Sequence, residues 1–450
     1  MGRLFGTDGI RGIANKDLTC ELATQLGRAA AEVLVNKSNQ HPTVIIGKDT
    51  RLSSDMLENA MAAGLCSVGA RVIMLGVVPT PAVAYLVGKY KADAGVMISA
   101  SHNSYEYNGI KIFSGDGYKL PDDLEIRIED IVLGDVDISS ELSVNENIGT
   151  VTHAANAVHD YIEHIKSTVH FSLDGLNLAI DCANGSASVS AETLFTDLGA
   201  NVHILNASPD GININDNCGS THMNGLSEYV KEHNLDAGIA FDGDADRCLV
   251  TDEKGELIDG DFIMAICAAD MKSRGKLSNN SVVGTIMTNL GFMRFCEEHG
   301  IRFEATKVGD RYVLEEMLLD NYNFGGEQSG HLIFRDFATT GDGQLTAAQL
   351  MSILRRREAS LSSLASLMER YPQTLKNINV SPKGKLEFYT NQNVKSAIDS
   401  AGKTLGKDGR VIVRPSGTEP LLRVMVEGQD YALIEKIAEE IAAVMKEELV

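Results

Sequence analysis

The sequence predicts an α/β protein with three similar α/β domains, whose sheets are mixed and mostly parallel, followed by a smaller C-terminal α+β domain. Short apolar runs typical of buried strands alternate with stretches of helical periodicity. This alternation occurs in three rounds along the 450 residues. Several of the predicted strands end in polar, Gly-rich loops, where parallel sheets carry their function.

The composition is that of a globular protein with several cores, since 44% of the residues are hydrophobic and 23% are charged. The net charge of −22 argues against nucleic acid as a main partner, because binding it depends on basic patches. The apolar stretch 72–87 contains Pro79 and Pro81 and is too short to span a bilayer. With no signal-peptide pattern and seven single cysteines, we expect a cytoplasmic protein with reduced thiols and no membrane partner.

The first round is assigned to a domain of residues 1–150. Its Gly-rich start, GTDGIRG, can present Arg11 to an anion. Ser53 or Ser54 is expected to cap the second helix, and residues 121–150 read as a helix followed by a surface connector. The predicted helices are 18–35, 54–68 and 82–87, and the predicted strands are 44–47, 71–78 and 95–98.

Ser101 follows the buried strand 95–98, in the loop of the motif ISASHN. A serine in this position can be a nucleophile or a phosphoryl carrier, although such residues also simply shape turns. His102 beside it is expected to position rather than to act as the base. Lys111 is a candidate cation near the transferred phosphoryl group or a proton-transfer group, the alternative being an exposed strand lysine.

The second round, residues 151–255, ends its last strand in DGDADR. Asp242, Asp244 and Asp246 can converge there, and clustered carboxylates repel one another unless a cation neutralises them. Hard oxygen ligands favour Mg²⁺ or Ca²⁺ over zinc. An alternative makes Asp242 itself the phosphoryl carrier, which leaves Ser101 without a role. The predicted elements are a helix at 154–165 and strands at 176–180, 201–205 and 237–241.

The third round, residues 256–370, contains GGEQSGH. Its glycines allow a ligand to approach the backbone closely. Glu327 and Ser329 can bond to vicinal sugar hydroxyls, with His331 assisting. The predicted elements are helices at 262–271, 290–299 and 344–356 and strands at 282–287 and 303–305.

The last predicted domain, residues 371–450, contains RPSGTEP. Its arginine can bind a phosphate through two hydrogen bonds, and the small residues that follow offer hydroxyls and backbone N–H groups. The candidate phosphate-binding residues are Arg414, Ser416, Gly417, Thr418 and Arg423. Two strands at 411–413 and 421–427 and an amphipathic helix at 431–449 suggest a small domain with an antiparallel sheet.

Seven motifs in this order resemble those of the α-D-phosphohexomutases along nearly the whole chain: GTDGIRG, ISASHN, NGIK, DGDADR, VGDRYV, GGEQSGH and RPSGTEP. Ser104 stands where many members have proline. The resemblance implies four domains around a central cleft, one Mg²⁺ per active site, a small sugar phosphate as substrate and a homodimer. It favours an amino sugar: glucosamine 6-phosphate and glucosamine 1-phosphate, with glucosamine 1,6-bisphosphate as intermediate.

The resemblance also implies roles for individual residues. Ser101 becomes the phosphoserine, and the three aspartates hold the metal with an oxygen of its phosphate. The groups beside the phosphoryl are Arg11, Lys111 and Arg247; the sugar is bound at Glu327 and Ser329; the phosphate not being transferred is bound by the RPSGTEP loop and Arg423. Glucose or mannose phosphates remain alternative substrates, and a non-catalytic sugar-phosphate-binding protein is the alternative from another class.

Overall fold

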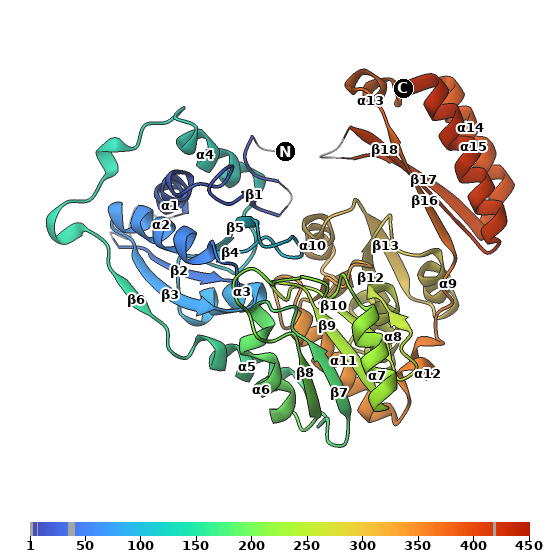
Figure 1. Ribbon diagram of the computed structural model, residues 1–450, viewed down its shortest axis with the longest axis horizontal. Helices are drawn as coiled ribbons and strands as arrows, with labels where there is room; N and C mark the ends of the chain where they lie inside the picture. The colour runs from blue at the N-terminus through green and yellow to red at the C-terminus, as the bar shows by residue number, and fades with distance from the viewer. Residues whose placement is uncertain (1–2, 7, 35–40, 417–419) are drawn as a thin grey trace. The chain divides into compact units, whose positions relative to one another are not determined.

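The computed structural model describes residues 3–6, 8–34, 41–416 and 420–450 (Figure 1). The contacts divide the chain into two compact units. The larger unit comprises the chain up to Thr288 together with His299–Leu367, and it contains three sheets. The smaller unit comprises Asn289–Glu298 and Met368–Val450 and contains one sheet.

The first sheet has the strand order β1-β5-β4-β2-β3-β6. Strands β4, β2, β3 and β6 are parallel, while β1 and β5 run antiparallel to their neighbours. The strands are β1 (Ile10–Ile13), β2 (Thr43–Lys48), β3 (Arg71–Val77), β4 (Ala94–Ile98), β5 (Tyr107–Ser114) and β6 (Val151–His153). The helices are α1 (Cys20–Leu34), α2 (Ser54–Ser67), α3 (Thr80–Lys89) and α4 (Asp122–Val132). The predicted helices and strands of this round are confirmed to within a few residues, whereas β1, β5 and β6 are additional.

The second sheet has the order β11-β10-β9-β7-β8, in which β9, β7 and β8 are parallel and β10 and β11 are antiparallel. The strands are β7 (Asn177–Asp181), β8 (Asn201–Leu205), β9 (Ala237–Phe241), β10 (Cys248–Asp252) and β11 (Leu257–Ile258). The helices are α5 (Ala157–Thr168), α6 (Ala191–Asp197) and α7 (Asn224–His233). All five residues of β9 are buried, which explains its unbroken apolar sequence.

The third sheet has the order β13-β12-β14-β15, with only β15 antiparallel. The strands are β12 (Ser281–Thr285), β13 (Arg302–Thr306), β14 (Phe324–Gly326) and β15 (Leu332–Phe334). The helices are α8 (Gly260–Ser273), α10 (Asp310–Leu319), α11 (Gly343–Arg357) and α12 (Leu361–Ala365). Short 3-10 turns lie at Ser139–Glu141, Asn145–Asn147, Ser186–Val189, Ser278–Asn280 and Gly406–Asp408.

The smaller unit has an antiparallel sheet of order β16-β18-β17. Apolar residues of α15, such as Ile434, Ile437 and Met445, form one core with Val424 and Val426 of the sheet. The strands are β16 (Gln373–Asn379), β17 (Gly409–Pro415) and β18 (Leu421–Gly428); the helices are α9 (Leu290–Glu298), α13 (Pro382–Glu387), α14 (Gln392–Leu405) and α15 (Tyr431–Leu449). The predicted α+β architecture is confirmed, while β16, α13 and α14 are additional.

Two features bear on the predicted domain boundaries at residues 150, 255 and 370, which remain predictions. Strand β6 lies beyond residue 150 and pairs with β3 in the first sheet. Helix α9, predicted within the third round, belongs to the smaller unit.

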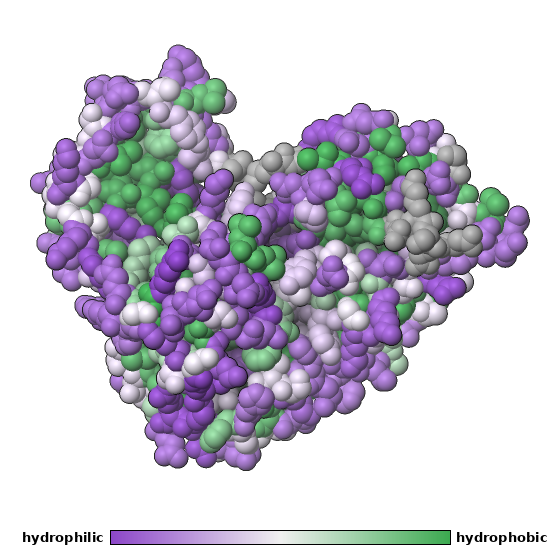
Figure 2. Space-filling model, turned by 180° about the vertical axis from the view of Figure 1, so that it is seen from behind, coloured by the Kyte–Doolittle hydropathy of each residue, from purple (hydrophilic) through white to green (hydrophobic). Residues whose placement is uncertain are grey.

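Hydrophilic side chains cover most of the face shown in Figure 2, with apolar side chains gathered between them. Among the helices of the described residues, none combines the length and the apolar character needed to cross a membrane.

A buried carboxylate ties α9 to the sheet of the smaller unit. Glu427 is fully buried on β18. Its Oε1 accepts hydrogen bonds from the backbone N–H of Leu290 (3.0 Å) and from Gln373 (2.7 Å), and its Oε2 accepts from Arg410 Nε (2.6 Å). One side chain on β18 therefore links the start of α9 to strands β16 and β17. The N-terminus of α9 also favours the negative charge of Glu427.

We expect Glu427→Ala to lower the free energy of unfolding of the smaller unit by about 3–5 kcal/mol, because it removes one partner of a buried ion pair. Urea unfolding, with hydrogen exchange at β16 and β18, measures the effect. The control is Glu435→Ala, because Glu435 is 43% exposed and lies 3.7 Å from Lys376; we expect a change below about 1 kcal/mol. Equal unfolding midpoints for the two variants would contradict the assignment.

Candidate active site

Ser101 lies directly after β4 and is buried, with 1% of its surface exposed. Its Oγ donates a hydrogen bond to Asp242 Oδ2 at 2.6 Å, so a hydroxyl from the first round meets a carboxylate from the second. Its φ is +54°, in the left-handed region that residues other than glycine rarely adopt and that is enriched at functional sites. The surrounding contacts must therefore hold this backbone in place.

Arg51, in the loop after β2, supplies much of that support. Its guanidinium is fully buried against Asp49 at 2.7 Å. It donates to the carbonyl oxygens of Ser101 and Asn103, both at 2.9 Å. Asn215 Nδ2 donates to the same Ser101 carbonyl at 2.9 Å. The serine loop is thus held by this buried ion pair and Asn215 together with its own turn, in which the backbone N–H of Ser101 donates to Ser99 Oγ at 2.9 Å.

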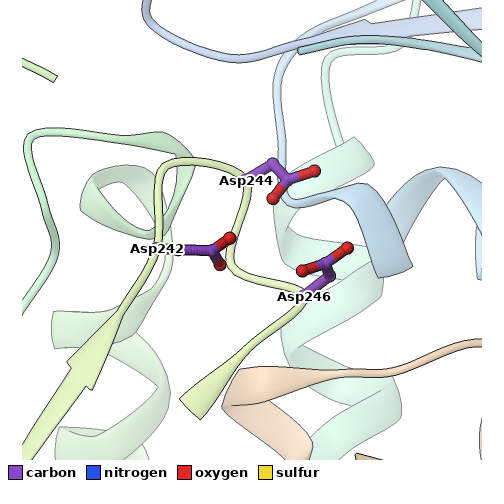
Figure 3. Close-up of side chains that lie close together, drawn as sticks. All are labelled: Asp242, Asp244 and Asp246. Atoms are coloured by element: carbon purple, nitrogen blue, oxygen red, sulfur yellow. The ribbon is translucent and has the colours of Figure 1, made fainter. Parts of the chain in front are cut away.

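Three carboxylates converge in the loop between β9 and β10 (Figure 3). Asp242, Asp244 and Asp246 are buried, and each offers one oxygen within 4.8 Å of the others. Gly243 between them lets this loop approach the serine loop, because a Cβ there would lie only 2.6 Å from the carbonyl oxygen of Ser101. The two loops therefore pack backbone to backbone.

The residues of this cluster fit a bound metal ion. Asp244 Oδ1 and Asp246 Oδ1 are buried and have no hydrogen-bond partner within the described part of the chain. Unsatisfied buried carboxylate oxygens are costly, and a cation compensates for that cost. Three carboxylates beside a serine oxygen form a hard donor set, which suits Mg²⁺ or Ca²⁺ better than zinc. The cluster can therefore hold a divalent metal ion.

Lys111 on β5 is the cation closest to these carboxylates. Its Nζ lies 2.8 Å from Asp244, 3.3 Å from Asp246 and 3.0 Å from Asp8. The alternative of an exposed strand lysine is wrong, since only 1% of its surface is exposed. Burial alone would lower the pKa of Lys111, but the carboxylates of Asp244, Asp8 and Asp246 raise it well above its ordinary value. Lys111 is therefore a fixed positive charge in this state rather than a base.

The acids of the cluster differ in their proton affinity. Burial, followed by repulsion from Asp246 and Asp244, raises the pKa of Asp242 to about 8. Burial also opposes ionisation of Asp246, but Lys111 and His331 hold the pKa of that carboxyl well below its usual range. The acid that contacts Ser101 is thus harder to ionise than Asp246.

A closed ring of five charged side chains and one histidine joins three parts of the larger unit. We call it the charge ring. Its members in order are Asp246, Lys111, Asp8, Lys119, Asp310 and His331. His331 closes it, at 3.6 Å from Asp246 and 3.5 Å from Asp310. Burial lowers the pKa of His331, but the carboxylates of Asp246 and Asp310 outweigh this and raise it above its ordinary value. Its Nε2 also accepts a hydrogen bond from the backbone N–H of Gly341 at 3.1 Å.

His102 lies between the serine and an arginine. Its Nδ1 is 3.4 Å from Ser101 Oγ and 3.0 Å from Arg247 Nη1. Partial burial of the ring and the cations of Arg247 and Arg11 lower the pKa of His102 to about 4. A neutral imidazole that accepts from Arg247 agrees with the expected positioning role. Arg11 donates to Asn103 at 3.4 Å, so it too reaches the serine loop.

The GGEQSGH loop packs against the segment that follows the three aspartates. Gly330 has a φ of +89°, and a Cβ there would lie 2.2 Å from the carbonyl oxygen of Cys248, so only glycine fits. Glu327 Oε1 accepts from the backbone N–H of Gly309 at 3.0 Å. Ser329 Oγ is buried and has no partner among the described residues, which leaves it available to a ligand.

The predicted phosphate-binding residues lie in the smaller unit. Arg414 on β17 is directly opposite Arg423 on β18. Burial and the neighbouring Arg423 lower the pKa of Arg414. Like charges placed opposite each other destabilise a sheet unless an anion lies between them. The backbone N–H of Ser416 donates to Leu421 at 2.9 Å and closes the hairpin. The predictions for Gly417 and Thr418 fall outside the described residues.

Sequence reasoning missed four residues of this site. Asp8 and Asp310 lie inside quoted motifs, GTDGIRG and VGDRYV, so their presence there was a usable signal. Arg51 lies in a loop after a predicted strand, a weaker signal of the same kind. Lys119 has no local signal, because only the fold brings it to Asp8 and Asp310.

Comparison with known proteins agrees with this arrangement. Models described as phosphoglucomutase/phosphomannomutase match almost the entire chain: α/β/α domain I at residues 2–173, domain II at 159–255, domain III at 259–371 and the C-terminal domain at 375–444. The chain belongs to the phosphoglucomutase/phosphomannomutase family. The α-D-phosphohexomutase resemblance seen in the motifs is thereby confirmed.

Within this family, the chain is similar over its full length to curated bacterial proteins. It is 54% identical to the phosphoglucosamine mutase of Caldanaerobacter subterraneus subsp. tengcongensis, covering 100% of both chains. It is 51% identical to that of Clostridium botulinum, covering 99% of each.

Solved structures share the family fold. A phosphoglucomutase/phosphomannomutase family protein from Burkholderia thailandensis gives a TM-score of 0.83 at 24% identity, covering 100% of this chain and 98% of that one. The N-acetylphosphoglucosamine mutase of Aspergillus fumigatus, in complex with GlcNAc-6P and magnesium, gives 0.69 at 16% identity, covering 100% and 96%.

We expect MgCl2 or MnCl2 to raise the Tm of metal-stripped protein, since an ion that binds only the folded state stabilises it by about 2.7 kcal/mol at 100 times its Kd. Differential scanning calorimetry before and after EDTA measures the shift. Asp244→Asn should reduce the shift, whereas Asp216→Asn, in an exposed loop, should retain it. An undiminished shift in Asp244→Asn would show that the ion binds elsewhere.

Proposed function

We propose that this protein is a phosphoglucosamine mutase, an isomerase that interconverts glucosamine 6-phosphate and glucosamine 1-phosphate and supplies amino-sugar nucleotide and cell-wall synthesis. The observation that carries the proposal is the hydrogen bond between Ser101 and Asp242 inside a buried carboxylate cluster. The 51–54% identity to phosphoglucosamine mutases over the full length supports the choice of substrate.

The reaction proceeds in two phosphoryl transfers. In the first, the sugar O1 attacks the phosphorus of phospho-Ser101, the O1–P bond forms and the Oγ–P bond breaks. The O1 hydroxyl loses its proton, and the departing Oγ takes one up. The 1,6-bisphosphate then turns round. In the second, Ser101 Oγ takes the 6-phosphoryl group, and its own proton leaves as the sugar O6 regains one. Asp242 orients that hydroxyl through its hydrogen bond.

Phosphoryl transfer depends on alignment and charge neutralisation more than on covalent chemistry. Asp242, Asp244, Asp246 and an oxygen at Ser101 would hold Mg²⁺. The ion, when bound, stabilises the negative charge of the transferring phosphoryl group. The buried ammonium of Lys111 adds positive charge.

Three further groups complete the transfer site. Arg11 and Arg247 reach the serine loop directly or through His102. Each is a guanidinium suited to phosphate oxygens. His102 holds Arg247 in place beside Ser101.

The sugar and the second phosphate need separate contacts. Glu327, Ser329 and His331 would bind sugar hydroxyls. The hydroxyl of Ser329, which has no hydrogen-bond partner within the described ranges, supports this role. The resting phosphate would be bound by Arg414, Ser416, Gly417, Thr418 and Arg423. The opposed arginines support a bound anion. A homodimer remains a prediction, which sedimentation velocity can test.

Glucose or mannose phosphates are the alternative substrates, because no side chain of the GEQSGH loop reads a 2-amino group in an obvious way. Turnover on glucosamine 6-phosphate, glucose 6-phosphate and mannose 6-phosphate under one set of conditions decides the preference. Preferred turnover of either hexose phosphate would overturn the amino-sugar assignment. Binding without any isomerisation would support a non-catalytic protein.

Ser101→Ala should reduce mutase turnover by more than about a thousandfold, because loss of a nucleophile removes the covalent route. The assay uses glucosamine 6-phosphate with Mg²⁺ and a trace of the bisphosphate. Ser104→Ala, an exposed serine three positions on, is the matched control and should retain activity. Substantial turnover by Ser101→Ala would refute the serine assignment.

The phosphorylated enzyme separates the serine route from the aspartyl route. Intact mass spectrometry should show a phosphate adduct on the native protein that survives hydroxylamine. An adduct lost in hydroxylamine would instead identify Asp242 as the carrier, since acyl phosphates react with that nucleophile.

Arg414→Ala should raise KM about 10- to 150-fold, since hydrogen bonds to charged groups contribute roughly 1.5–3 kcal/mol. Initial rates against substrate concentration measure it. Lys383→Ala, 84% exposed in the same unit, should leave KM unchanged. Unaltered KM and kcat in Arg414→Ala would remove the phosphate-binding role.

A further inference from the structure

A second cavity in the larger unit shares no lining residue with the active site described above. It has a volume of about 450 Å³, within the range of small-molecule sites. It lies between α8, β15 and α11 and the end of α5, and α11 packs against both α8 and α5. Nothing in the proposed mutase reaction uses it.

The floor of this cavity is apolar. It is formed by the buried side chains of Cys267 and Met271 on α8, Phe334 on β15 and Ile353 on α11. Phe171 and Phe337 add two aromatic rings to the lining, and Phe171 is 47% exposed. An exposed phenylalanine beside an apolar floor offers a surface on which a planar ring can stack.

The polar part of the lining is positively charged. Arg274, Lys276 and Arg356 line the cavity, whereas Asp336 is the single carboxylate among the described residues of the lining. Asp336 already accepts a hydrogen bond from Asn323 at 2.8 Å.

The neighbouring acid is shared among several cations. Asp270 is 1% exposed and forms ion pairs with Arg274 at 2.7 Å, with Arg357 at 3.3 Å and with Arg356. Lys276 forms no ion pair with any carboxylate of the described residues. Three lining cations, Arg274, Lys276 and Arg356, thus face one lining carboxylate (3 − 1), and two of them also pair with the buried Asp270 behind the lining.

Arg274 and Arg356 share the single carboxylate of Asp270, and Lys276 has no ion pair among the described residues, so these side chains can also receive an anion. Phosphate suits guanidinium groups because of its paired oxygens. Inorganic phosphate alone would leave the apolar floor and the aromatic rim without a partner. The lining therefore fits a molecule with an anionic end and a planar apolar body.

We propose that this cavity binds a nucleoside phosphate. Its phosphate lies against Arg274, Lys276 and Arg356, and its base stacks on Phe171 and Phe337 above the floor formed by α8 and α11. This binding activity is additional to the mutase reaction and does not depend on it.

Isothermal titration calorimetry of the full-length protein with UMP, UDP, AMP and ADP tests the proposal, with uridine, adenosine and inorganic phosphate as partial ligands. At least one nucleotide should bind with a Kd below about 1 mM. It should bind at least tenfold more tightly than its own nucleoside and than phosphate. Absence of binding by all four nucleotides, or equal affinity for phosphate alone, would overturn the proposal.

Variants place the binding in this cavity rather than in the active site. Lys276→Glu, at the rim, should weaken nucleotide binding at least tenfold, and Met271→Trp should block the floor. Lys254→Glu, an exposed lysine elsewhere, makes the same charge change and should leave the nucleotide Kd unchanged. Arg414→Ala should also leave the nucleotide Kd unchanged. Binding lost in Arg414→Ala but kept in Lys276→Glu would assign the nucleotide to the active site and refute the proposal.

Discussion

The burial of three carboxylates against one lysine is the constraint on which the site depends. Asp242, Asp244 and Asp246 cannot remain together away from water unless positive charge lies among them. Lys111 supplies part of it at 2.8 and 3.3 Å from two of them. Because the lysine comes from β5 and the acids follow β9, satisfying this charge balance requires the first and second sheets to meet along these loops.

The charge ring extends the same logic to the third sheet. Asp310 and His331 come from the third round, and Lys119 and Asp8 from the first. Asp8 pairs with Arg11 as well as with Lys111 and Lys119, so the ring shares its charge compensation with other groups of the site. The precise placement that phosphoryl transfer requires is therefore built into the electrostatics of the fold. Arg51 provides the corresponding rigidity for the backbone of Ser101.

Much of the site could be predicted because its residues directly follow apolar strands, and this pattern can be recognised in the sequence alone. Ser101 after β4 and the aspartates after β9 are examples. Lys119 could not be predicted, since its partners are Asp8 and Asp310, which only the fold brings to it. The local pattern made Lys111 a candidate cation but equally allowed an exposed strand lysine, and only the fold shows that it is buried.

The strands likewise divide into those that the sequence predicts and those that it does not. Strands with unbroken apolar runs, such as β4 and β9, are buried on both faces and were predicted. Strand β16 was not, because its residues alternate between buried and exposed positions and include several polar side chains. Pairing with β18 decides its conformation, and pairing between distant segments leaves little trace in either segment alone.

The assignment of α9 to the C-terminal unit has a consequence for how the molecule can be dissected. The backbone passes between the two units three times, at Thr288, at Glu298 and at Leu367. A fragment beginning at Met368 would lack the helix whose Asn289 exchanges two 3.0 Å hydrogen bonds with the backbone of Tyr371. No single cleavage of the polypeptide yields both units intact, because the smaller unit is built from two segments that are separated in the sequence.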